Sequence, residues 1–304
     1  LFSLSLFLSL RLPWVRSGLS QVFRPFSALD WQQFIRIARL ALPYGFAFFA
    51  TTIYRQTDIT LIAFFRADYE LQNAYYGTMM RIAEVGFLLP TFLLNSALPL
   101  LSTGGVEQGS DGERARLRGQ ILLAVLSLGS IVASFSYFWS RPIALLLTQK
   151  NYLSTALHPG ADTALELLSF SMFLSGVVAY CFYLLLTMHH WRPLLVATSI
   201  AAAISVMLNI ALIPLFGFVG AAIASIVTHL LLATSLSALT LKYMKVYLPF
   251  TKFFSWLGFT ISLSGLLMLM GPSQTSELST VIAYIIYIKI IFLLLRTFSL
   301  LPKF

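Results

Sequence analysis

Long apolar stretches alternate with short polar ones along the whole chain. The apolar stretches hold roughly 20 to 30 residues each, and about 20 residues in a helix cross the hydrocarbon core of a bilayer. Because backbone groups within that core must bond to one another, continuous apolar stretches of this length indicate helices rather than barrel strands. The pattern predicts an all-α membrane protein with eight spanning helices, at residues 37–65, 72–102, 119–139, 162–188, 193–213, 218–241, 253–271 and 279–300.

Polar stretches rich in turn residues separate the predicted spans. The most loop-like is TGGVEQGSDGERARLRG (103–119), and shorter breaks occur at HHWRP (189–193) and PLFG (214–217). The stretch SRPIALLLTQKNYL (140–153) is too short to cross, so we expect an interfacial or re-entrant turn there. A basic amphipathic connector, KYMKVYLPFTK (242–252), leads into the last two spans.

The residues ahead of the first span follow a different pattern. Residues 1–10, LFSLSLFLSL, are apolar but too few to cross, and we interpret them as the end of an upstream helix in a longer protein that is truncated here. Apolar Phe34, Ile37 and Leu40 share one helical face, which predicts an amphipathic helix on the inner membrane surface. These patterns predict three parts: an upstream remnant with a surface linker (1–36), a six-helix lobe (37–241), and a connector with two additional helices (242–304).

Composition and charge placement agree with this picture. Only 10% of the residues are charged, against about 25% in soluble domains. If residues 1–36 lie inside, that side holds 14 of the 20 basic residues in total: Arg11, Arg16, Arg24, Arg36, Arg39, Arg114, Arg116, Arg118, Arg192, Lys242, Lys245, Lys252, Arg296 and Lys303. The other side holds Arg66, Arg141 and Lys150. The positive-inside rule therefore predicts that both chain ends are cytoplasmic, and this placement argues against nucleic acid as a partner.

The first two predicted spans each carry an arginine and an acid inside an apolar sequence. Arg55 and Asp58 lie in the first span, and Arg81 and Glu84 lie in the second. The members of each pair are at i and i+3 and so share a helix face. Counted from the turn between the spans, all four lie within about 10 Å of one another in depth. A charge near the bilayer centre costs about 2.5 to 3.5 kcal/mol, so we expect these four to face protein or a water-filled cavity.

Two interpretations of the four charges stay open at this stage. In one, they form a self-neutralising network that locks the two helices together. In the other, Arg55 and Arg81 attract an anion into a central cavity, while Asp58 and Glu84 hold the guanidinium groups or bind coupling cations. Lys289, in the last predicted span, either snorkels to the membrane surface or adds to a basic cavity lining.

Other reactive residue types fit ordinary structural roles. The single cysteine, Cys181, lies inside an apolar stretch, so the chain has neither an internal disulfide nor a cysteine-based metal site. His189 and His190 lie in a predicted turn without metal-ligand spacing, and His229 fits a packing role on a small-residue helix. We therefore expect no metal, no cofactor and no enzymatic activity.

Two segments of the chain resemble a known superfamily. The segment MLNIALIPLFGFVGAAIASIVTHLLLA (207–233) has an asparagine near a helix end, a proline turn, and small residues opening the next helix: Asn209, Pro214, Gly217, Gly220, Ala221, Ala222 and Ala224. The glycines permit a tight outer turn, and small residues let two helices approach closely. The segment at 40–102, from LALPYGFAFF to ALPLLS, resembles the hairpin that opens a lobe. Together they are similar to the polysaccharide flippases of the multidrug/oligosaccharidyl-lipid/polysaccharide exporter superfamily.

This resemblance implies a C-terminal six-helix lobe with two appended helices, whose central cavity is completed by an N-terminal lobe. It implies transport of a polyprenyl-diphosphate-linked oligosaccharide across the bacterial plasma (inner) membrane, for a surface polysaccharide such as the O-antigen of lipopolysaccharide. Alternating access coupled to H⁺ or Na⁺ is implied as well. Arg55 and Arg81 would then donate bidentate hydrogen bonds to the diphosphate or to acidic sugars.

Three alternatives remain. An ion-coupled multidrug antiporter of the same superfamily would favour a cavity dominated by acids, whereas here arginines match the acids one for one. A membrane glycosyltransferase or polymerase of the same pathway should carry a large outer loop or a soluble domain with paired carboxylates. A non-transporting scaffold lobe would depend on a partner protein for its role.

Overall fold

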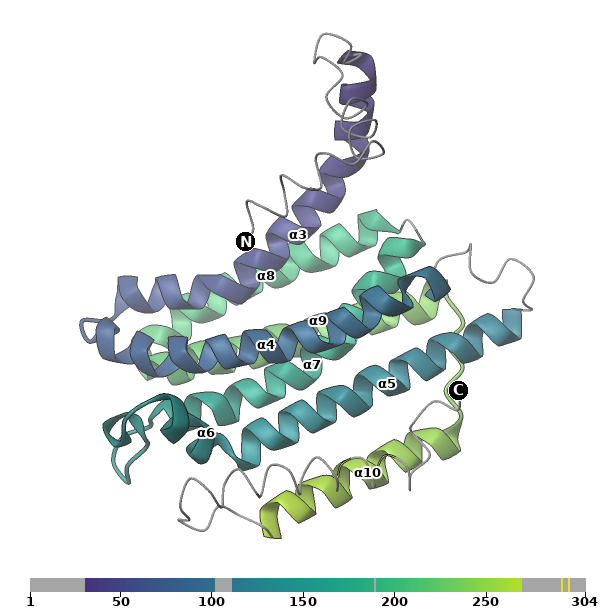
Figure 1. Ribbon diagram of the computed structural model, residues 1–304. Coiled ribbons are helices and arrows are strands. Elements are labelled where there is room, and N and C mark those ends of the chain that lie inside the picture. Colours follow the sequence, from purple (N-terminus) through teal and green to yellow (C-terminus); the bar gives the residue numbers. More distant parts are fainter. Residues whose placement is uncertain (1–30, 102–110, 189, 270–290, 292–294, 296–304) are drawn as a thin grey trace, which may run out of the picture. The chain divides into compact units, whose positions relative to one another are not determined.

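A computed structural model describes residues 31–101, 111–188, 190–269, 291 and 295 of the chain (Figure 1). The regular elements within these residues are all helical, and no strand occurs among them. Their bounds are α3 Trp31–Phe65, α4 Tyr69–Leu101, α5 Asp111–Phe138, α6 Ser140–Leu147, the short 3₁₀ helix η3 Lys150–Tyr152, α7 Ala161–Thr187, α8 Trp191–Phe216, α9 Phe218–Tyr243 and α10 Phe250–Leu269.

Six helices in the described part of the chain are long and apolar enough to cross a membrane. The candidate spans are Tyr69–Ala97, Gly112–Phe138, Ala161–Thr187, Trp191–Phe216, Phe218–Tyr243 and Phe250–Leu269. They coincide with six of the eight spans that the sequence pattern predicts. The expectation of a helical, multi-pass membrane protein is thus confirmed at this level.

The two remaining predicted spans have different outcomes. The first, 37–65, lies within the helix α3, but α3 is not among the six candidates. Its second half is rich in polar side chains, from Thr51 to Asp58, and these lower its apolar character. The last predicted span, 279–300, lies outside the described residues except for 291 and 295, and Lys289 lies outside them too.

The chain divides into two compact units, Leu1–Phe46 and Ala47–Phe304. The boundary falls inside α3, which runs without interruption from Trp31 to Phe65. The predicted surface helix and the predicted first span are therefore parts of one helix. In the second unit, the stretch expected to form an interfacial turn contains α6 and η3.

Helix α7 is at the centre of the second unit. It packs against α4, α5, α6, α8 and α9, while α8 also packs on α9 and α10 lies along α5 (Figure 1). A helix that is apolar on every face is stable only when it is surrounded by other apolar surface, and α7 has this character. Several of its hydroxyl groups bond within the protein, as in the 3.1 Å contact between the Ser171 and Ser225 hydroxyls that joins α7 to α9.

The turn between α3 and α4 is bonded to the turn between α8 and α9. Arg66 forms an ion pair with Asp68 at 2.8 Å, which lowers the pKa of this exposed carboxyl, and it also donates to the Pro214 carbonyl at 3.4 Å. Gln72 accepts a 2.9 Å hydrogen bond from the Phe218 amide. Helices α3 and α8 therefore end on the same side of the unit, and the two run parallel.

Glycine is required at two positions of the turn between α8 and α9. Gly217 has φ +60°, a conformation that side-chain-bearing residues rarely adopt. At Gly220, an added Cβ would lie 2.4 Å from the Leu212 carbonyl oxygen, so only glycine allows α9 to turn back this closely on α8. Pro214 lies in the last turn of α8. Ala221, which follows Gly220 on α9, is fully buried.

Candidate functional site

Helix α4 carries an ion pair in the middle of its apolar sequence. Arg81 Nη1 lies 2.9 Å from Glu84 Oε2, and the two residues flank Ala83, the central residue of the candidate span Tyr69–Ala97. The Arg81 side chain is 73% exposed, whereas that of Glu84 is 27% exposed. A guanidinium group is thus presented away from the protein core at mid-span.

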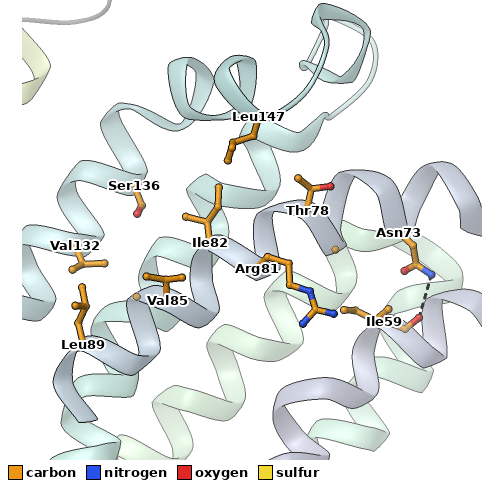
Figure 2. Close-up of a pocket in the computed structure, with 12 residues that line it drawn as sticks. Ile59, Asn73, Thr78, Arg81, Ile82, Val85, Leu89, Val132, Ser136 and Leu147 are labelled. Atoms are coloured by element: carbon orange, nitrogen blue, oxygen red, sulfur yellow. Dashed lines mark hydrogen bonds between the residues drawn. The ribbon is translucent and has the colours of Figure 1, made fainter. Parts of the chain in front are cut away.

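A cavity of about 820 Å³ lies beside this pair. Arg81, Asn73 and Thr78 of α4 and Ser136 of α5 supply its polar lining. Figure 2 shows Arg81 extending toward Ile59 of α3, while Val85 and Leu89 lie on the side of Val132 of α5. The cavity therefore has a polar region, with a cation and an amide, and an apolar region made of branched side chains.

Two features of the lining concern what this cavity can hold. An added Cβ at Gly77, which lines it, would have no neighbouring atom within 4 Å. Asn73 donates to the Ile59 carbonyl at 3.3 Å, while its own buried amide oxygen has no hydrogen-bond partner. The empty space at Gly77 and the free acceptor of Asn73 are both compatible with a polar ligand or water in this region.

Asp58 lies on α3 and does not pair with Arg55. It is buried, accepts a hydrogen bond from the Tyr76 hydroxyl of α4, and accepts a second one from the Ile59 amide at 2.9 Å. Ion pairs occur instead between Arg66 and Asp68, at the turn between α3 and α4, and between Arg81 and Glu84 on α4. The expected pairing at i and i+3 thus occurs on α4 but not on α3, because a tyrosine of the adjacent helix reaches Asp58.

Arg55 instead contacts an aromatic ring. Its guanidinium carbon lies 4.7 Å from the centroid of the Phe87 ring on α4. Side chains on a helix tilt toward its N-terminus, and α3 and α4 are antiparallel, so these two side chains point toward each other. Phe87 is in turn stacked on His229 of α9, with ring centroids 5.5 Å apart and planes inclined by 17°.

His229 is held from several directions. It is buried, its Nδ1–H donates to the Ser225 carbonyl at 2.8 Å, and the Tyr54 ring meets it edge-on at 5.5 Å. Since the carbonyl can only accept, Nδ1 carries the proton in this arrangement. This geometry agrees with the packing role expected for His229. The His229 ring also supports the ring of Phe87.

Asn209 lies on α8, facing α3. Ser205, one turn earlier, donates to the Tyr54 carbonyl at 3.5 Å, and the next turns of these parallel helices carry Asn209 and Asp58. The Asn209 amide group donates to the Ser205 carbonyl at 3.0 Å, while its buried oxygen has no partner. The α3–α8 contact thus carries a second free acceptor near the level of Asp58.

The structure therefore distributes the predicted site residues between different environments. Arg81 lines the cavity beside Glu84, whereas Arg55 is not among the lining residues, and Asp58 is buried against Tyr76. Sequence reasoning missed Tyr76 and Phe87. The available signal is helical spacing, since Tyr76, Met80, Ala83 and Phe87 form one buried face of α4.

Together, these observations define a helical multi-pass membrane protein with charged groups and a cavity along its second long helix. No group of His, Cys, Asp or Glu side chains within the described ranges is arranged to hold a metal ion. Comparison of the chain with protein-family models, curated proteins and solved structures finds no match.

Proposed function

We propose that the chain is part of a membrane transporter that moves an anionic, lipid-linked oligosaccharide across a bacterial plasma membrane. The observation that carries this proposal is Arg81, an exposed cation at mid-span in the wall of a cavity of about 820 Å³. An arginine facing acyl chains at this depth is costly. The position of Arg81 is therefore better accounted for by a polar passage than by lipid.

The size and lining of the cavity suit a glycolipid head group. Cavities of about 300 to 1,000 Å³ accommodate small-molecule ligands, which corresponds to a diphosphate with its first sugars rather than to a whole oligosaccharide. Arg81 would meet the diphosphate, and Asn73, Thr78 and Ser136 would bond sugar hydroxyls. The branched residues on the far side would contact the apolar parts of the substrate.

Charge pairing favours an anionic substrate over a cationic drug. Glu84 is already paired with Arg81, and Asp58 is buried against Tyr76, so neither acid dominates the cavity. Asp58 is a buried carboxyl without a cationic partner, and it is our proposed site for a coupling H⁺ or Na⁺. The resemblance to polysaccharide flippases supports the same assignment, and a second lobe would cover the exposed side of α4.

The distribution of basic residues supports an orientation. Arg116, Arg118, Arg192, Lys242 and Lys245 lie at the helix ends opposite the α3–α4 turn. We propose that this basic end is cytoplasmic and that the substrate moves from it toward the end that carries Arg66.

The test uses the full-length protein in its bacterial host. Arg81→Ala should abolish export of the surface polymer while the protein stays in the membrane at a normal level, and Arg81→Lys should restore part of it because the charge remains. Arg141→Ala, a change of an exposed arginine on the short helix α6, is the matched control. Normal polymer in the Arg81→Ala strain would refute the role of this residue, and altered drug susceptibility with normal polymer would favour the antiporter.

A further inference from the structure

Arg55 of α3 contacts an aromatic ring and not an acid. Within the part of the chain that the structure describes, it forms no ion pair, and its guanidinium carbon lies 4.7 Å from the Phe87 centroid. The two forms of stabilisation differ in consequence. A carboxylate places a negative charge beside the cation, whereas the negative face of an aromatic ring attracts the cation without adding a net charge.

The Phe87 ring is fixed by its surroundings. It is 3% exposed, and it is stacked on His229 with an interplanar angle of 17°. His229 is fixed in turn by the Ser225 carbonyl of its own helix, and Ser225 bonds to Ser171 of the central helix α7. A continuous series of side-chain contacts thus connects α7 and α9, through His229 and Phe87, to the Arg55 guanidinium group on α3.

We propose that Phe87, supported by His229, is a positioning residue that holds Arg55 as an uncompensated cation for the anionic group of the substrate. This inference rests on the proposed transport function and names a residue that acts through Arg55. It accounts for an arginine that lies three residues from an acid and yet does not pair with it. In this view, Asp58 is bonded to Tyr76, and the charge of Arg55 is not paired with that acid.

The experiment changes the ring electronically while keeping its shape. Phenylalanine analogues with one, two and three ring fluorines are incorporated at position 87 of the full-length protein in nanodiscs of phosphatidylethanolamine and phosphatidylglycerol. Fluorine withdraws electron density from the ring face, so binding of the probe, undecaprenyl diphosphate, should weaken stepwise. The trifluoro ring or Phe87→Leu should weaken it roughly tenfold. The same series at Phe92, an exposed phenylalanine of the same helix, should have no effect.

A second measurement separates this inference from the transport proposal. In detergent, the melting temperatures of Arg55→Gln, Phe87→Leu and the double variant form a cycle, and a direct contact predicts non-additive changes. If Arg55→Gln weakens binding but fluorination at position 87 does not, Phe87 is not a positioning residue and the transport proposal stands. If the cycle shows coupling but neither Arg55→Gln nor Arg81→Ala alters binding, the contact exists and both functional assignments fail.

Discussion

The bond between Tyr76 and Asp58 allows a quantitative test of how α3 is joined to α4. The Tyr76→Phe change removes one oxygen from a fully buried side chain and leaves its ring in place, so almost no packing is lost. It deprives a buried carboxyl of one of its two hydrogen-bond donors, the other being the Ile59 amide.

Two ranges of hydrogen-bond free energy are relevant to the expected loss of stability. Hydrogen bonds between membrane helices average about 0.6 kcal/mol and reach about 1.7 kcal/mol, whereas bonds to charged groups contribute about 1.5 to 3 kcal/mol. Asp58 is only 4% exposed, so water cannot replace the tyrosine hydroxyl. We therefore expect Tyr76→Phe to lower the free energy of unfolding by about 1.5 to 3 kcal/mol.

The assay is reversible unfolding in mixed micelles titrated with dodecyl sulfate, for Tyr76→Phe, Asp58→Asn and the double variant. The interaction term of this cycle should exceed about 1 kcal/mol. Tyr75→Phe is the matched control, because this neighbouring tyrosine makes ring contacts with Tyr152 and Phe218 and its hydroxyl has no hydrogen-bond partner among the residues that the structure describes. A Tyr76→Phe effect no larger than that of the control, or an additive cycle, would show that the bond does not join α3 to α4.

Two further predictions concern glycines. Gly77→Phe should fill the cavity and block polymer export without loss of folded protein in detergent, since a Cβ at Gly77 has open space around it. Gly265→Phe on α10, where a Cβ also has open space, should leave export intact. Export by the Gly77→Phe protein would exclude the cavity from the transport pathway. Gly220→Ala should destabilise the fold by about 1 to 3 kcal/mol, because its Cβ would lie 2.4 Å from a backbone oxygen. Gly265→Ala should have no such cost in the same unfolding titration, and equal stability of both variants would contradict the close approach of α8 and α9.

The sequence predicts the helices well and their side-chain partners less well. Apolar stretches of spanning length identify six helices because burial in lipid requires this pattern whatever the helices pack against. The same argument is weaker for α3, whose second half carries polar and charged residues. It also does not show that α3 continues back to Trp31 without interruption, since a change from amphipathic to apolar pattern does not require a break in the helix.

Spacing within one helix predicted only half of the pairing. The i, i+3 relation places Arg81 beside Glu84, and this pair forms. It places Arg55 beside Asp58 equally well, but spacing carries no information about neighbouring helices. Here the closer partners are Phe87 for the cation and Tyr76 for the acid, and both are ordinary packing residues by type. Identifying them requires the register between α3 and α4.

The register between α3 and α4 connects α4 to the buried acid and to both arginines. Asp58 and Arg55 of α3 both bond to the buried face of α4, through Tyr76 and Phe87, while the exposed face of α4 presents Arg81 to the cavity. A rotation or shift of α4 relative to α3 would therefore change the surroundings of the buried acid and of both cations together. In the transport that we propose, binding of an anion at the arginines and uptake of a cation at Asp58 would both act on the contacts of this one helix. The α3–α4 contact alone would then be sufficient to couple anion binding to cation uptake.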